Sequence, residues 1–159
     1  MIATTTIRPR PYQIEALDGI RSQFENNNST LLVMATGLGK TITFSELGGE
    51  YITHGRVMVL AHREELISQA YQKLLNITGH EPDVEMGEHH INQSALYQSP
   101  IVLSTIQTQI SGRDGLGRMT KFEPQDFSLL IIDEAHHSAA QSYRRVIDYY
   151  RRNPDLKVL

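Results

Sequence analysis

Short apolar runs alternate with longer amphipathic stretches along the chain. The runs contain few polar residues, as expected for parallel strands covered on both faces, and they lie at Thr30–Ala35, Arg56–Ala61, Ile101–Ser104, Ser128–Ile132 and Leu156–Leu159. The stretches between them follow a helical pattern and predict helices at Tyr12–Glu25, Lys40–Thr53, Glu64–Leu75 and Ala140–Arg151. This alternation predicts an α/β fold with a doubly wound parallel sheet.

Two stretches depart from the alternation. Gly79–Ser99 is polar and is interpreted as a crossover that contains at most a short strand near Val84–Met86. Ser111–Gln125 holds three glycines and a proline, which is typical of a surface loop. Because the chain has 159 residues and no repeat or linker, we expect one domain over residues 1–159.

Composition restricts the classes of function without selecting one. The absence of cysteine excludes a disulfide framework and a thiolate metal site. No apolar run approaches the ~20 residues that span a bilayer, and Met1–Arg10 has no apolar signal core. We therefore expect an intracellular, cytoplasmic protein that does not insert into membranes. The net charge is −3, so any case for nucleic-acid binding has to rest on local residues.

A glycine-rich segment joins the first apolar run to the helix predicted after it. Ala35–Thr41 reads ATGLGKT, and in this context the backbone can curl its N–H groups around a phosphate. Lys40 can reach the β- and γ-phosphates, and the Thr41 hydroxyl can bind Mg²⁺. Met34 stands where the full phosphate-loop pattern has glycine, so a plain glycine-rich turn is the alternative. The candidate nucleotide ligands are Thr36, Gly37, Leu38, Gly39, Lys40 and Thr41.

Two adjacent acids follow the apolar run at Ser128–Ile132. Because open α/β sheets bind ligands at the carboxyl ends of their strands, Asp133 and Glu134 are expected to converge with Lys40 on one crevice. Asp133 would hold Mg²⁺ through water, and Glu134 would orient and deprotonate the attacking water. The alternative is that both acids stabilise the start of the next helix.

These motifs together resemble superfamily 2 helicases of the DEAH-box kind. The group that they resemble most includes the helicase subunit of type III restriction enzymes and related repair helicases. Ala35–Thr41 is similar to motif I of that family and Asp133–His136 to motif II. The resemblance implies a RecA-like phosphate-loop NTPase domain that uses ATP and Mg²⁺, with Lys40 and Glu134 in catalysis. It also implies that His136 couples the nucleotide site to a second motor domain.

The resemblance extends to the segment before the phosphate loop. Arg10–Gln13 reads RPYQ, like the segment that precedes motif I in the family. This implies that Gln13 recognises the adenine edge, for which its amide offers both a donor and an acceptor, and that Arg10 lies near the base. The alternative for Gln13 is a surface residue at a helix start.

Two further segments resemble motifs that contact nucleic acid. Val59–Leu66 is similar to motif Ia and Ser104–Thr108 to motif Ib, which implies contacts with the sugar–phosphate backbone of one strand, DNA in preference to RNA. Such contacts position a strand without reading its sequence. In the alternative, the threonine caps a helix and the arginine is a solvated charge. The candidate nucleic-acid residues are His62, Arg63, Thr105 and Gln107.

The family's next motif is expected after Leu156–Leu159, so the chain resembles a first motor domain that is truncated before the second RecA-like domain of the same parent chain. The parent is then expected to hydrolyse ATP and to move along or unwind DNA, while the isolated chain binds nucleotide with little turnover. One alternative is a nucleotide-binding module of a restriction or remodelling complex that does not separate strands. Another phosphate-loop enzyme, such as a small kinase or a GTPase, is disfavoured because the sequence has motif Ia and Ib matches and lacks an N-K-x-D run.

Overall fold

The structure, a computed structural model, describes residues 8–112, 115–137 and 140–159. Its helices are α1 (Pro11–Asn26), α2 (Lys40–Tyr51), α3 (Glu64–Thr78), α4 (Ile106–Ile110) and α5 (Gln141–Tyr150). The strands are β1 (Arg56–Ala61), β2 (Asp83–Glu85), β3 (Ile101–Thr105), β4 (Phe127–Ile132) and β5 (Lys157–Val158). Three short 3₁₀ helices are η1 (Arg118–Lys121), η2 (Pro124–Asp126) and η3 (Ala135–His137). The parts of the sequence predictions that concern residues 1–7 and 113–114 lie outside these ranges.

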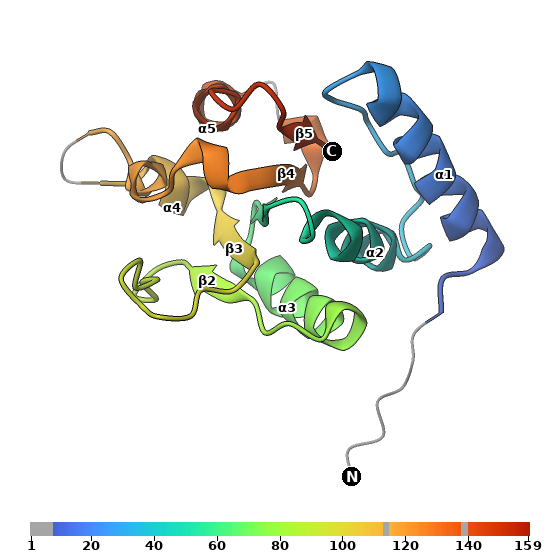
Figure 1. The fold of residues 1–159 in the computed structure, drawn as a ribbon, viewed down its shortest axis with the longest axis horizontal. Coiled ribbons are helices and arrows are strands. Elements are labelled where there is room, and N and C mark those ends of the chain that lie inside the picture. The colour runs from blue at the N-terminus through green and yellow to red at the C-terminus, as the bar shows by residue number, and fades with distance from the viewer. Residues whose placement is uncertain (1–7, 113–114, 138–139) are drawn as a thin grey trace, which may run out of the picture.

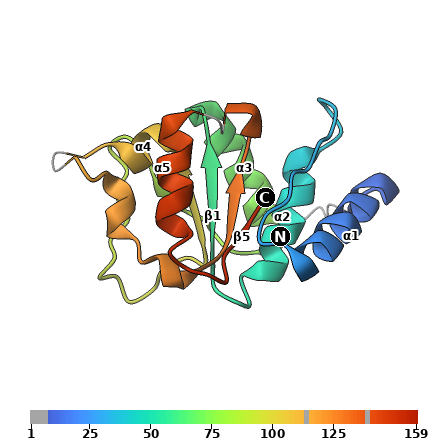
Figure 2. The ribbon, with the colours of Figure 1, turned by 90° about the horizontal axis from the view of Figure 1, so that it is seen from above.

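The five strands form one parallel sheet in the order β2-β3-β1-β4-β5. Helices α2 and α3 cover one face of the sheet, and α4 and α5 cover the other (Figure 1). Helix α1 packs on α2 at the outside of its layer (Figure 2). The predicted doubly wound α/β architecture is confirmed. The chain places β2 and β3 on one side of β1 and then β4 and β5 on the other. The topological switch point therefore lies between β1 and β4, where folds of this class place their ligands.

Alternate residues of the strands supply the cores on the two faces of the sheet. Val57 and Val59 of β1 pack in the core under α1, α2 and α3, whereas Met58 and Leu60 pack in the core under α4 and α5. All four side chains are at most 1% exposed. A strand buried on both faces has no polar side to display, which explains why β1 reads as a continuous apolar run.

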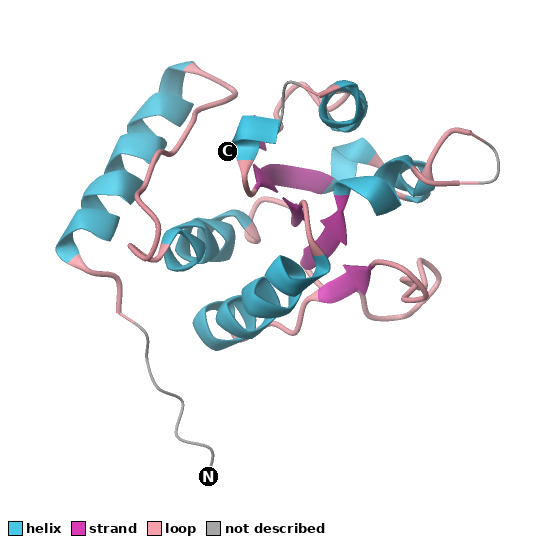
Figure 3. Cartoon of the chain, turned by 180° about the vertical axis from the view of Figure 1, so that it is seen from behind, coloured by secondary structure: helices cyan, strands magenta, loops and turns pink. Residues whose placement is uncertain are grey.

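The prediction of a strand at Thr30–Ala35 is wrong. The segment meets the sheet only at its start, where the Thr30 N–H bonds to the Val158 carbonyl, and Figure 3 shows the whole connection between α1 and α2 as loop. Leu31 and Val33 are 68% and 83% exposed. A strand needs a neighbour along its full length, and β5 has only two residues. The backbone beyond Thr30 therefore leaves the sheet and projects from it (Figure 2).

Both stretches that were expected to be irregular contain short ordered elements. The polar crossover holds β2, close to the short strand predicted near Val84–Met86. The second stretch holds η1 and η2, and Met119 of η1 and Phe122, the residue after it, are buried in the core beneath α5. Their spacing of three residues is the local signal that the surface-loop interpretation of Ser111–Gln125 overlooked.

The register of the sheet brings three strand ends to one edge. Ala61 of β1 pairs with Thr105 of β3, and Leu60 pairs with Ile132 of β4. The Asp133 N–H continues this pattern and bonds to the Leu60 carbonyl at 2.9 Å. The residues that follow β1, β3 and β4 therefore start from the same edge. No helix in the described part of the chain is long and apolar enough to cross a membrane.

Candidate nucleotide site and adjoining groove

The phosphate-loop lysine meets the acidic pair across the β4 end of the sheet. Lys40 opens α2, and its Nζ lies 3.6 Å from Asp133 Oδ1 and 3.7 Å from Glu134 Oε1. The side chains of Lys40, Asp133 and Glu134 are 36%, 11% and 37% exposed. The three groups expected to surround a nucleotide phosphate therefore lie together and remain accessible.

Glu134 has a backbone conformation that places strain at this site. Its φ of 59° is the only positive φ of a non-glycine residue in the described ranges, a conformation that costs ~1–2 kcal/mol for an L residue. Strain of this kind persists where the surroundings fix it, and it concentrates at functional sites. The Asp133 carboxylate accepts the Glu134 N–H at 3.0 Å, and Glu134 Oε2 lies 3.2 Å from Nδ1 of His136, which is 65% exposed. The turn thus aims the Glu134 carboxylate outward, toward Lys40.

The glycine-rich loop presents an accessible helix start. Gly37 and Gly39 have φ values of 84° and 78°, and residues 36–38 are exposed. Gly39 is the N-cap of α2 without a side-chain cap, so the first amides of the helix have no partner within the helix. An anion is favoured at such an end because free N–H groups and the helix dipole both point at it.

A small cavity lies behind the lysine and the two acids. Its volume is about 50 Å³, and it is lined by Leu31, Leu32, Lys40, Phe44, Ile131, Ile132, Asp133, Glu134, Ala135 and Leu159. A cavity of this size holds a few water molecules and no nucleotide. A nucleotide would therefore have to place its phosphates at the open α2 end and leave its sugar and base outside this cavity.

The structure places Gln13 beside the phosphate loop. Its side chain is buried, with Nε2 donating to the Leu38 carbonyl at 2.9 Å and Oε1 accepting the Arg10 N–H at 2.8 Å. Tyr12 adds a hydroxyl bond to the same Leu38 carbonyl at 3.1 Å. The amide of Gln13 thus holds the loop in place here, and reading an adenine edge would require it to exchange these bonds. The adenine role of Gln13 and Arg10 stays a prediction.

The predicted nucleic-acid residues border one open groove of about 630 Å³. Arg63 and Gln107 are exposed on its surface. Thr105 is buried, and its hydroxyl accepts the Thr108 N–H at 3.2 Å, so it caps α4. The capping alternative for Thr105 is therefore confirmed. The lining residues are His62, Arg63, Glu64, Glu65, Gly87, Thr105, Gln107, Thr108, Ser111 and Arg118.

Two residues near these sites were not found by sequence reasoning. Arg118 reaches the groove from η1, a segment interpreted as loop. Tyr143 of α5 is buried near the acidic pair, where burial raises the pKa of its hydroxyl and the charges of Asp133 and Glu134 raise it further. Tyr143 therefore stays protonated beside the acids. The helical pattern of Ala140–Arg151 predicted a helix there and no functional residue on it.

The donor set at the site fits a magnesium–nucleotide complex. Mg²⁺ prefers hard oxygen ligands and is commonly held by one or two carboxylates together with substrate phosphates and water. Asp133 is a partly accessible carboxylate within 3.6 Å of the phosphate-loop lysine. Thr41, the second residue of α2, adds a hydroxyl from the helix start. Few protein ligands are expected at such a site, because phosphate oxygens complete the coordination of the ion.

Comparison with known sequences assigns the chain to a family. The sequence profile of the family described as type III restriction enzyme, res subunit, matches residues 6–158. The chain belongs to this family. The res-subunit match covers nearly the whole chain and includes both the loop at Thr36–Thr41 and the acids at Asp133–Glu134.

Relatives of this res-subunit chain include named helicases. IRC3 of Saccharomyces cerevisiae, which carries the name of an ATP-dependent helicase, is 32% identical over 155 residues, an alignment that covers 89% of this chain and 21% of IRC3. The DNA 3′-5′ helicase XPB of Kineococcus radiotolerans is 29% identical over 146 residues, covering 90% of this chain and 24% of XPB. The chain thus spans between a fifth and a quarter of the length of these relatives.

Solved structures share the fold at low sequence identity. The ATP-dependent Type ISP restriction-modification enzyme LlaBIII, bound to DNA, aligns with a TM-score of 0.68 and 21% identity over 97% of this chain and 12% of that enzyme. The UvsW helicase of bacteriophage T4 aligns with a TM-score of 0.66 and 19% identity over 96% of this chain and 51% of UvsW. Together with the family match, these likenesses identify a RecA-like domain of the superfamily 2 helicase and restriction-enzyme class.

The two loop glycines give a matched test of the contact with Gln13. A Cβ on Gly39 would lie 2.5 Å from Gln13 Nε2, whereas a Cβ on Gly37 would meet nothing within 4 Å. Alanine at either position has to adopt a left-handed φ, which lowers the free energy of unfolding by ~1–2 kcal/mol. Gly39→Ala should lose about 1 kcal/mol more in the free energy of unfolding, because it displaces the buried Gln13 amide from Leu38. Urea denaturation of both variants measures this difference, and equal losses would contradict the contact.

Proposed function

We propose that the chain is the first motor domain of an ATP-dependent helicase or translocase that moves along or unwinds DNA. The observation that carries this proposal is the meeting of Lys40 with Asp133 and Glu134, within 3.7 Å, at the edge where the strands end. Segments more than 90 residues apart in the sequence supply these groups. The names of the two relatives, an ATP-dependent helicase and a DNA 3′-5′ helicase, support an ATP-driven activity on DNA in preference to RNA.

In this proposal Lys40 changes partners when a nucleotide binds. Its ammonium now lies between two carboxylates, and the phosphates at the α2 start would attract it more strongly because they carry more charge and more acceptor oxygens. Thr36, Gly37 and Gly39 would offer backbone amides to those phosphates, as loops that precede a helix do. Leu38 would first have to exchange the bond from its N–H to the Ala35 carbonyl. Binding thus releases the two acids from Lys40 for the chemistry.

The two released acids have different roles in the proposal. Asp133, the less exposed, would hold Mg²⁺ through water together with the Thr41 hydroxyl, and a bound ion would neutralise charge on the phosphates. Glu134, turned outward by its strained backbone, orients the attacking water and accepts its proton. His136, within 3.2 Å of Glu134, is positioned to relay the state of the site to a second motor domain of the same parent chain.

The groove beside the nucleotide site is proposed to hold one nucleic-acid strand. Arg63 supplies a charge, Gln107 a side-chain amide and the α3 start free N–H groups, all of which are phosphate donors. Thr105 contributes through the capped start of α4 and not through a free hydroxyl. His62, the residue that follows β1, lines the same groove. These donors would let a chain with a net charge of −3 bind a polyanion locally.

Lys40→Ala should lower the affinity for ADP with Mg²⁺ by roughly tenfold or more, because a charge-assisted bond to phosphate contributes ~1.5–3 kcal/mol. Lys40 is partly exposed, so the fold should be retained. Calorimetric titration of wild type, Lys40→Ala and the control Lys73→Ala, a lysine on α3 away from the site, measures the effect. Equal affinities for Lys40→Ala and wild type would rule out the assignment of Lys40.

Residues 1–159 alone should release phosphate from ATP at a rate near background, with or without DNA. An arginine from a second motor domain contributes ~10³–10⁵ in rate to this kind of reaction, and this domain is proposed to supply only its own half of the cleft. A longer protein with the second domain should turn over, and Glu134→Gln in it should abolish turnover while sparing ATP binding. A steady-state phosphate-release assay compares the three, and rapid turnover by residues 1–159 would overturn the two-domain proposal.

A further inference from the structure

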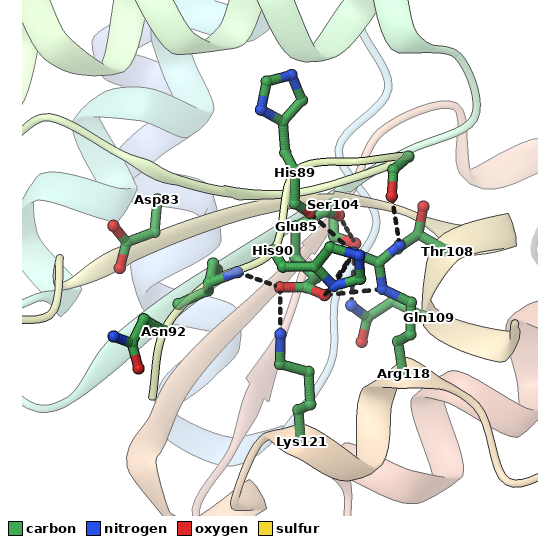
Figure 4. A network of polar contacts seen from close by, with 12 residues as sticks. Asp83, Glu85, His89, His90, Asn92, Ser104, Thr108, Gln109, Arg118 and Lys121 are labelled. Carbon is green, nitrogen blue, oxygen red and sulfur yellow. Dashed lines mark hydrogen bonds and ion pairs between the residues drawn. The ribbon is translucent and has the colours of Figure 1, made fainter. Parts of the chain in front are cut away.

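The buried carboxylate of Glu85 links the segment that follows β2 to η1, and both of these segments border the groove. Glu85, the last residue of β2, is 0% exposed, and its carboxylate accepts the Ile91 N–H at 2.7 Å, Lys121 Nζ at 2.9 Å and Arg118 Nε at 2.8 Å. Figure 4 shows Arg118 and Lys121 pointing at Glu85 from η1, while the chain that follows β2 folds back over it. None of these residues belongs to a motif that the proposed function uses.

This cluster carries more positive than negative charge. Burial opposes ionisation of Glu85, but hydrogen bonds from Lys121, the Ile91 N–H and Arg118 outweigh it and hold the pKa of Glu85 below its ordinary value. Glu85 is therefore a carboxylate at neutral pH, and one negative charge faces the two positive charges of Arg118 and Lys121. His90, whose Nδ1 lies 3.5 Å from Glu85 Oε1, adds no negative charge. The cluster keeps one excess positive charge.

The excess charge borders the groove at Arg118. Of the two cations, Arg118 lines the groove and Lys121 does not. The carbonyls of Gly87 and His89 accept from Arg118 Nη1 and Nη2, both at 2.8 Å, and so fix the plane of the guanidinium. Nη2 also lies 3.0 Å from His90 Nδ1, and the Arg118 side chain is 16% exposed, so it remains partly accessible from the groove.

The groove is lined by acidic as well as basic residues, so the position of Arg118 helps to show where an anion would bind. Glu64 and Glu65 at the α3 start also line it, so an anion would be attracted at particular points and not along its whole length. Arg63 provides one such point beside the α3 start, and Arg118 provides another beside α4. A strand with regularly spaced phosphates is the kind of ligand that separate, fixed cations suit.

We infer that Arg118 is a phosphate-binding residue of this groove and that Glu85 positions it. The inference rests on the proposed function, in which the groove takes a nucleic-acid strand. A guanidinium held in one plane suits a phosphate better than a mobile cation does, since its N–H groups match the phosphate oxygens and little rotamer freedom remains to be lost. Glu85 acts through Arg118 and touches no ligand itself.

Arg118→Gln and Lys121→Gln form a matched pair for the test. Each removes one positive charge from the partners of Glu85, but only Arg118 reaches the groove. Binding of a fluorescent single-stranded oligothymidylate to the 159-residue chain is measured by anisotropy over a range of low salt concentrations. Arg118→Gln should weaken binding about tenfold, and its plot of log affinity against log salt should be shallower by ~0.7, as expected when one single-strand phosphate contact is lost. Lys121→Gln should keep the wild-type slope.

Arg118→Lys and ADP titration separate a phosphate contact from a structural effect. The lysine keeps the charge but not the fixed fork, so it should retain the wild-type slope while recovering only part of the affinity. All variants should bind ADP as the wild type does. Equal changes of slope in Arg118→Gln and Lys121→Gln would overturn the inference, since Arg118 would then act only as a partner of Glu85. Wild-type chain that binds ADP but no oligonucleotide would refute the groove assignment and the inference with it, leaving the nucleotide site intact.

Discussion

The attraction between Lys40 and the two acids organises the functional end of this domain. Two carboxylates on adjacent residues repel each other, and the turn that carries them is strained at Glu134. The ammonium of Lys40, 3.6 and 3.7 Å away, offsets this repulsion without closing the site to solvent. The contact also joins the start of α2 to the end of β4. A nucleotide phosphate would compete for the same ammonium, so the interaction that stabilises this arrangement is the one that binding must replace.

The sheet and most of its helices were predictable, because a strand that is buried on both faces consists almost entirely of apolar residues. β1, β3 and β4 read as apolar runs, and their carboxyl ends had to meet at one edge once the sheet was parallel. The same signal failed at Thr30–Ala35. Apolar residues show that a segment can be buried, but whether it pairs as a strand depends on a neighbouring strand. Here β5 contacts the segment only near Thr30. The loop nevertheless reaches α2 with Lys40 directed at the acids, because Gln13 holds Leu38 and Gly39.

The polar interior was beyond sequence reasoning for a different reason. Glu85 and Arg118 are 33 residues apart, and neither lies in a pattern with a fixed spacing. A further chain of bonds runs from Tyr150 through Gln109 and Ser104 to the Glu85 carbonyl, and thus links α5 to β2 beneath α4. Each of these polar groups is costly to bury alone and inexpensive once paired. Such pairing can be recognised only when the fold has brought the partners together, which is why the place of Arg118 in the groove became apparent from the structure.

We propose that the phosphate loop and the acidic pair hold one metal–nucleotide complex between them. The most direct test replaces Mg²⁺ by paramagnetic Mn²⁺ in the presence of ADP and follows the amide signals of the 159-residue chain by NMR. We expect the signals of Lys40, Thr41, Asp133 and Glu134 to broaden together, and to recover when ADP is omitted at the same metal concentration. Broadening at only one of the two segments, or broadening at Glu64 and Glu65 in place of Asp133 and Glu134, would contradict this proposal.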